Sequence, residues 1–246
     1  MEDKIINKTN SENFLNSFKE IGHYLRKVTN EVKETSFYAL VDKASLSNSA
    51  VKHFKDDLKE FADLRNAIIH ERTDNHVIAE PNDRTVRELN NIALLLLQPP
   101  KVSSFFRNKV FKLLSKDSIA KAVEFMYVKS FSQVPIYEDK KFIGLLTSNT
   151  IARWLGASVR DDIFSLEETS ISMVLKEYTE DKDNCEFLNR TATLFDVLKK
   201  FQEYETKGKG LDAILITANG KPDEELLGII TVWDLPSVYR EIERHN

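Results

Sequence analysis

Three polar side chains that could carry chemistry, Arg65, Asn66 and His70, fall within six residues of one predicted helix. Arg65 stands where the helical pattern calls for an apolar residue. The apolar residues that share its stripe are Val51, Phe54, Leu58, Phe61 and Ile68. An ionised guanidinium on a core-facing stripe is costly unless it is paired or opens into a cleft. Arg65 therefore needs either a carboxylate partner or a site to serve.

The spacing of the three residues limits how they can act together. Asn66 and His70 are four apart and share one helix face, whereas Arg65 and His70 point about 140° from each other. One straight helix cannot aim both at one group, so either the helix distorts or a symmetric partner chain completes the site. Two purely structural roles stay open: Arg65 could pair with a carboxylate such as Asp63 or Glu60, and His70 could cap the helix C-terminus.

The elements that would position these residues form a helical region over residues 11–97. Further helices are expected at about 34–46 and from near Ser49 onward. The first and last helices are marked by the apolar stripes Phe14, Phe18, Ile21, Leu25, Val28 and Val86, Leu89, Ala93, Leu96. Together these segments predict an antiparallel bundle of about four helices. Pro99 and Pro100 cannot continue the last helix and mark a domain boundary.

Beyond the two prolines the sequence changes to short apolar runs alternating with helical segments, and the pattern occurs twice. The matching segments are 117–126, 134–137 and 142–147 in the first copy, and 192–201, 214–217 and 227–231 in the second. Matching helix positions lie 75 residues apart and matching glycines 84 apart, so the second copy holds about nine extra residues, at 205–210 and 220–225. The pattern predicts two β-α-β-β-α units with a cleft between them, and thus an α+β protein of two domains.

The two copies resemble a tandem CBS domain, or Bateman module, over about residues 101–243. The resemblance places one repeat at 101–160 and the other at 171–243, after a helical domain at 1–98. It implies that a cleft binds AMP, ADP, ATP or another adenosyl ligand. The family's ligand motif is a glycine, two apolar residues, Thr or Ser, two variable residues and Asp, and the second copy matches it from Gly228 to Asp234.

The motif suits a nucleoside in chemical terms. A carboxylate such as Asp234 can accept hydrogen bonds from both ribose hydroxyls, and the hydroxyl of Thr231 can reach sugar or phosphate. In the first copy Thr147 matches the motif, but Thr150 replaces the aspartate. We therefore expect one competent site, built around Thr231 and Asp234, and a second that is empty, altered or structural. A plainer role for Asp234 is to cap the last helix, with Pro236 in its first turn.

The segment 61–71 resembles the signature of HEPN domains, helical bundles in which Arg, a polar residue, apolar residues and His mark a ribonuclease site. The resemblance implies metal-independent RNA cleavage by the RNA's own 2′-hydroxyl, at a site shared by two subunits. Arg65 would then stabilise charge on the phosphorane, His70 would act as general acid or base, and Asn66 would orient the phosphate or the imidazole. Many HEPN domains are non-catalytic interaction units.

Composition limits the partners and the compartment. The net charge of −4 is divided evenly, with 14 basic and 16 acidic residues in 1–98 and 21 and 23 in 99–246. Neither half is a basic nucleic-acid-binding domain by bulk charge. Cys185 stands alone, so no internal disulfide can form, and no zinc-ligand spacing is present. The chain has no signal-like start and no apolar run long enough for a bilayer, which predicts a soluble cytoplasmic protein without membrane contact.

The leading functional hypothesis is a homodimeric sensor, paired through both modules. In this hypothesis an adenosyl ligand in the CBS pair controls two HEPN bundles that cleave RNA without a required cofactor or metal. The rival hypothesis is a non-catalytic adaptor that binds the ligand and dimerises. A third is a structural protein with neither ligand nor reaction.

Overall fold

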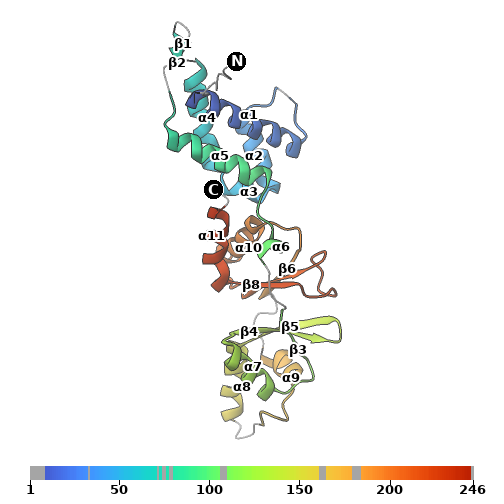
Figure 1. The fold of residues 1–246 in the computed structure, drawn as a ribbon. Helices are drawn as coiled ribbons and strands as arrows, with labels where there is room; N and C mark the ends of the chain where they lie inside the picture. The colour runs from blue at the N-terminus through green and yellow to red at the C-terminus, as the bar shows by residue number, and fades with distance from the viewer. Residues whose placement is uncertain are drawn as a thin grey trace, which may run out of the picture. The chain divides into compact units, whose positions relative to one another are not determined.

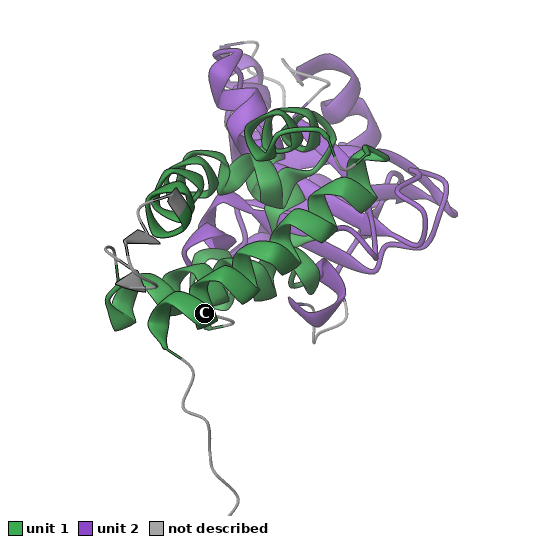
Figure 2. Cartoon of the chain, turned by 90° about the horizontal axis from the view of Figure 1, so that it is seen from above, with its two compact units in different colours: residues 1–100, 193–199, 237–246 green, residues 101–192, 200–236 purple. Residues whose placement is uncertain are grey.

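The computed structural model describes residues 9–32, 34–70, 72–73, 76–77, 80–105, 110–160, 165–178 and 184–244. The side chain of His70 lies outside the described part, as do those of the short strands that follow it. The chain folds into two compact units (Figure 2). Unit 1 comprises Met1–Pro100, Thr193–Lys199 and Ser237–Asn246, and unit 2 comprises Lys101–Ala192 and Lys200–Pro236.

Unit 1 is built mainly from helices that begin at polar capping residues. Thr9 forms a capping box with Glu12, and Ser36 and Asn82 cap the second and the last helix of the bundle. The elements are α1 (Asn10–Thr29), α2 (Phe37–Ser47), α3 (Ser49–His53), α4 (Lys55–His70), the antiparallel pair β1 (Arg72–Thr73) and β2 (His76–Val77), and α5 (Asp83–Leu97). Helices α1 and α5 run side by side, and α1 also packs on α2 and α4 (Figure 1).

The predicted apolar stripes of α1 and α5 are confirmed with one exception. Their members are buried apart from Val28, which is 38% exposed, while Thr29 takes its place inside. The stripe continues from Leu25 by four residues rather than three, and the Thr29 hydroxyl donates to the Leu25 carbonyl at 2.8 Å. The expected single helix from Ser49 is wrong in detail, because a turn at Phe54 separates α3 from α4.

The first repeat lies wholly in unit 2. Its elements are α6 (Val102–Phe105), β3 (Leu113–Leu114), α7 (Ile119–Lys129), β4 (Gln133–Glu138), β5 (Lys141–Thr147) and α8 (Ser148–Arg160). Strand β4 is central, parallel to β3 and antiparallel to β5. Helices α7 and α8 cover one face of this sheet together with the helix Ile171–Tyr178 that begins the second repeat, and a core that includes Ile119, Leu146 and Trp154 fills the space between them (Figure 1).

The second repeat has the same order of elements, as predicted. It consists of α9 (Ile171–Tyr178), β6 (Cys185–Asn189), α10 (Leu194–Thr206), β7 (Ala213–Thr217), β8 (Gly228–Thr231), the 3₁₀ turn η1 (Val232–Asp234) and α11 (Leu235–Arg244). Strand β7 is parallel to β6 and antiparallel to β8. The long connection between β7 and β8 turns at Gly220, where φ is +79° and a Cβ would lie 3.2 Å from the Asn189 nitrogen. Glycine is therefore required at this turn.

A second core lies within unit 2 and joins residues of both repeats. Tyr137, Leu215 and Leu226 are buried there, and Phe142 packs edge-on against the rings of Tyr137 and Phe187. Burial raises the pKa of Tyr137 to about 12, so its hydroxyl stays protonated. Among the described residues that hydroxyl has no hydrogen-bond partner.

None of the described helices is both long and apolar enough to span a bilayer.

Candidate ligand site in the repeat unit

A pocket of about 720 Å³ opens in unit 2, a size typical of small-molecule sites. Both repeats contribute to its lining. Phe111, Phe131 and Gln133 come from the first repeat, and Thr231, Trp233 and Asp234 come from the end of β8 and from η1. The pocket therefore combines an apolar, largely aromatic wall with one carboxylate.

Asp234 is held in place by the threonine at the start of its own motif. The backbone N–H and the hydroxyl of Thr231 both donate to Asp234 Oδ2, at 2.8 and 3.0 Å. The bond from the Thr231 N–H is one half of a capping box around η1, which leads into α11 with Pro236 in the first helical turn. A carboxylate has about four acceptor positions, so roughly two of them stay available on Asp234. Asp234 thus caps the turn and lines the pocket at the same time.

The corresponding position in the first repeat is arranged differently. Thr147 and Thr150 are both buried, and their hydroxyl oxygens lie 3.0 Å apart. The Thr150 N–H also donates to Thr147 Oγ1 at 3.1 Å, so Thr147 caps the start of α8. Thr147 is not part of the pocket lining, and its role in ligand binding stays a prediction.

The aromatic wall from the first repeat escaped the sequence analysis. Phe111, Phe125 and Phe131 form a cluster with ring centroids 5.5 to 6.3 Å apart, and Lys129 Nζ lies 5.3 Å from the Phe111 ring. Gln133 Nε2 donates to the Asp212 carbonyl at 3.0 Å. The sequence repeat was the one signal that could have indicated this wall. Two pseudo-symmetric copies can bring the start of the central strand of one copy near the ligand motif of the other.

The three residues of the opening motif lie at the C-terminal end of α4. Arg65 and Asn66 are half-buried and in contact, because Arg65 Nη1 donates to Asn66 Oδ1 at 3.2 Å. Asp63, one carboxylate considered as a partner for Arg65, instead accepts from the Tyr38 hydroxyl of α2 at 2.5 Å. His70 is the last residue of α4, and its side chain falls outside the described residues.

Comparison with known proteins identifies the repeats. Residues 102–157 and 175–240 each match the CBS domain family. The CBS domain structure NE2398 is 15% identical, with 57% of this chain and 97% of that chain covered at a TM-score of 0.43. CBSX2 in complex with AMP is 16% identical, with 59% of this chain and 99% of that chain covered at a TM-score of 0.43. The CBS domain pair of MJ0100 in complex with 5′-methylthioadenosine and S-adenosyl-L-methionine is 16% identical, with 58% of this chain and 98% of that chain covered at a TM-score of 0.42.

No curated protein gives a significant sequence match. The family matches begin at residue 102, so the resemblance of the helical part to HEPN domains stays a prediction. Two matches in sequence order, on two sheets with the same element order, account for the whole repeat pattern. The C-terminal part of this chain is therefore a tandem pair of CBS domains.

Proposed function

We propose that the tandem CBS domains bind one adenosyl ligand in the pocket beside Asp234. The observation that carries this proposal is the position of Asp234, half-buried in a lining that is otherwise neutral among the described residues. The two acceptor positions left on the carboxylate match the two hydroxyls of a ribose. The apolar wall around Phe111 and Phe131 suits the faces of a purine.

We infer one site rather than two because the repeats differ at the aspartate position. Thr150 offers a single oxygen, which is already engaged with Thr147. A ribose diol would have to break that buried pair and would meet no carboxylate. The ligand site is therefore assigned to the second motif alone.

Titration calorimetry with AMP, ATP and S-adenosylmethionine tests this assignment. Asp234→Asn keeps the shape and a capping oxygen but removes the charge, so binding should weaken by about 1.5–3 kcal/mol, which corresponds to roughly 10- to 150-fold. A 2′-deoxy analogue should weaken wild-type binding and have little further effect in the variant. Asp196→Asn, which changes the other Thr-x-x-Asp turn outside the pocket, is the matched control. Equal affinity in wild type and Asp234→Asn would refute the site.

We also propose metal-independent ribonuclease activity for the helical unit, with Arg65, Asn66 and His70 as the reacting group. The observation in its favour is that the Arg65 guanidinium contacts an amide, while no described carboxylate lies within ion-pair distance of it. A half-buried cation that has no counter-ion among the described residues can bind a phosphate. The helical spacing of Arg65 and His70 calls for a second chain to complete the site.

RNA cleavage in the presence of EDTA tests this second proposal. Wild type should cleave, whereas Arg65→Ala and His70→Ala should lose activity and His23→Ala, exposed on α1, should keep it. Sedimentation should show a dimer under the same conditions. No cleavage with or without an adenosyl ligand would favour the rival function, a cytoplasmic adaptor that senses the ligand and dimerises.

A covalent route exists for coupling the two functions. The motif Thr231–Asp234 leads directly into α11, whose residues from Ser237 onward belong to unit 1. Helix α10 likewise begins in unit 1 and ends in unit 2. If the ligand controls the helical unit, its addition should change the dimer affinity by the same factor by which dimerisation changes ligand affinity. The cleavage rate should change as well, but without that equality, because the reciprocity applies to binding alone.

A further inference from the structure

Trp233 is an unusually exposed indole at a ligand pocket. It stands between Thr231 and Asp234 in η1, lines the pocket, and is 79% exposed. The other tryptophan, Trp154, is 2% exposed within the core of the first repeat. An indole carries a large apolar surface whose contact with water is unfavourable. The bare face of Trp233 is therefore available to a flat apolar partner in or at the mouth of the pocket.

The other aromatic side chains of the pocket are already packed. Phe111 and Phe131 are 44% and 43% exposed, and each has ring contacts with the other and with Phe125. Their positions are fixed by this cluster, so they form a preformed apolar surface. Trp233 comes from the opposite repeat and supplies the least covered ring.

We propose that Trp233 stacks on the purine base of the ligand whose ribose Asp234 holds. This inference rests on the proposed adenosyl site and names the residue that recognises its base. In a nucleoside the base is attached to C1′, next to the carbon that bears the 2′-hydroxyl, so base and diol are close together. Adjacent residues, Trp233 and Asp234, then contact adjacent parts of one ligand.

Stacking also defines what the pocket selects. A π-face is common to all bases, so Trp233 requires a base without reading its edge. The ligand class is thus a nucleoside or nucleotide, and a bare sugar phosphate should bind weakly even though it retains the ribose diol. The Gln133 amide accepts from the Ser132 hydroxyl and donates to the Asp212 carbonyl, which leaves one N–H and one lone pair of the amide uncommitted.

Intrinsic fluorescence and calorimetry on the full chain test the stacking. With excitation at a wavelength that adenine does not absorb, emission should fall on titration with AMP or S-adenosylmethionine and stay constant with ribose 5-phosphate. Buried Trp154 supplies a constant background, which a Trp154→Phe variant removes. Trp233→Ala should weaken AMP binding about 5- to 150-fold, and Trp233→Phe should restore part of the loss.

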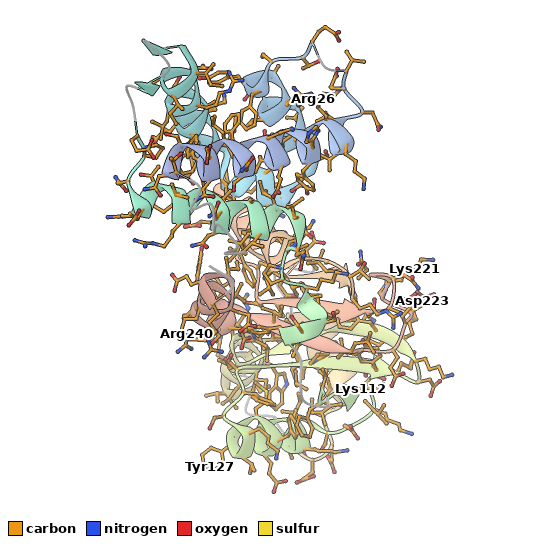
Figure 3. The ribbon with its side chains drawn as sticks, turned by 45° about the horizontal axis from the view of Figure 1, so that its top comes forward. Arg26, Lys112, Tyr127, Lys221, Asp223 and Arg240 are labelled. Carbon is orange, nitrogen blue, oxygen red and sulfur yellow. The ribbon has the colours of Figure 1, made fainter. Side chains whose placement is uncertain are left out.

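Tyr127→Ala is the matched control, because Tyr127 is 84% exposed on α7, is absent from the pocket lining and points outward (Figure 3). Its AMP affinity should equal that of wild type. If calorimetry detects AMP in wild type while Trp233→Ala binds equally well, or while emission does not respond, the stacking is overturned and the Asp234 site survives. If wild type binds none of the adenosyl compounds, the site and the stacking fall together.

Discussion

Asp196 and Asp234 end two Thr-x-x-Asp turns with the same local hydrogen bonds. Asp196 Oδ2 accepts from the N–H and the hydroxyl of Thr193 at 2.8 and 2.9 Å, as Asp234 does from Thr231. The remaining oxygens differ, since Asp196 Oδ1 accepts from the Ser49 hydroxyl and Asp234 borders the pocket. The short pattern predicts the capped turn, but the tertiary partner of the second oxygen lies far away in sequence and cannot be predicted from the pattern.

At Asp196, truncation should lower stability without affecting ligand binding. Asp196→Ala removes the carboxylate that accepts from the N–H and the hydroxyl of Thr193 at the start of α10 and leaves the Ser49 hydroxyl without this partner, so the free energy of unfolding in urea should fall by about 1–2 kcal/mol. Asp234→Ala loses only the two bonds that its carboxylate accepts from Thr231, so its free energy of unfolding should fall by less while its AMP binding is lost. Unchanged urea unfolding of Asp196→Ala would show that these bonds do not stabilise the fold.

Glu224 gives the connection between β7 and β8 a defined pH dependence. Its carboxylate accepts from the backbone and side-chain nitrogens of Asn219, at 2.7 and 2.6 Å, and these bonds lower its pKa from 4.5 to about 2. The folded pKa is the lower one, so the stabilisation is complete above pH 4.5 and is lost as the pH falls toward 2. The melting temperature of Glu224→Gln should therefore lie below that of wild type at pH 7. The difference between the two melting temperatures should narrow as the pH falls from 4.5 toward 2.

Asp223→Asn is the control for that series, because Asp223 points outward from the same turn (Figure 3). The melting temperature of Asp223→Asn at neutral pH should equal that of wild type. A difference in melting temperature between wild type and Glu224→Gln that stays constant from pH 7 to pH 3 would contradict the assigned hydrogen bonds of Glu224.

Among the elements, the repeat was the most predictable feature. Helices α7 and α10 begin 75 residues apart at Ile119 and Leu194, as their matched apolar patterns predicted. The turn at Phe54 was not predictable, because the apolar stripe continues through it without a proline or glycine. The cap of α3 by Asn48, whose Oδ1 accepts from the Val51 N–H at 3.0 Å, depends on backbone geometry that the pattern does not reveal.

In the core shared by the two repeats, removal of the Tyr137 hydroxyl should make the protein more stable. Tyr137 is fully buried and its hydroxyl has no partner among the described residues. Tyr137→Phe keeps the ring and removes an unsatisfied group, so the free energy of unfolding should rise by about 1 kcal/mol. Tyr127→Phe, at an exposed ring, should leave it unchanged. A loss of stability in Tyr137→Phe would mean that the hydroxyl has a partner, such as a buried water.

For the molecule as a whole, the sequence predicted the two classes of structure but not how they share the chain. Residues 193–199 and 237–243, which the repeat pattern places in the second copy, group with the helical unit. The pocket is a similar case, since Phe131 and Trp233 lie in different repeats and only folding brings both to its lining. Motif spacing reveals residues that act within one turn, such as Thr231 and Asp234, and misses those joined by packing.

The number of adenosyl molecules bound per chain tests the central claim most directly. Equilibrium dialysis with labelled AMP or S-adenosylmethionine should give one per chain for wild type and for Thr147→Val, which alters only the first repeat. Asp234→Ala should bind none at the same concentration. Two molecules per chain, or one that is lost in Thr147→Val and retained in Asp234→Ala, would contradict the assignment of the ligand to the second motif.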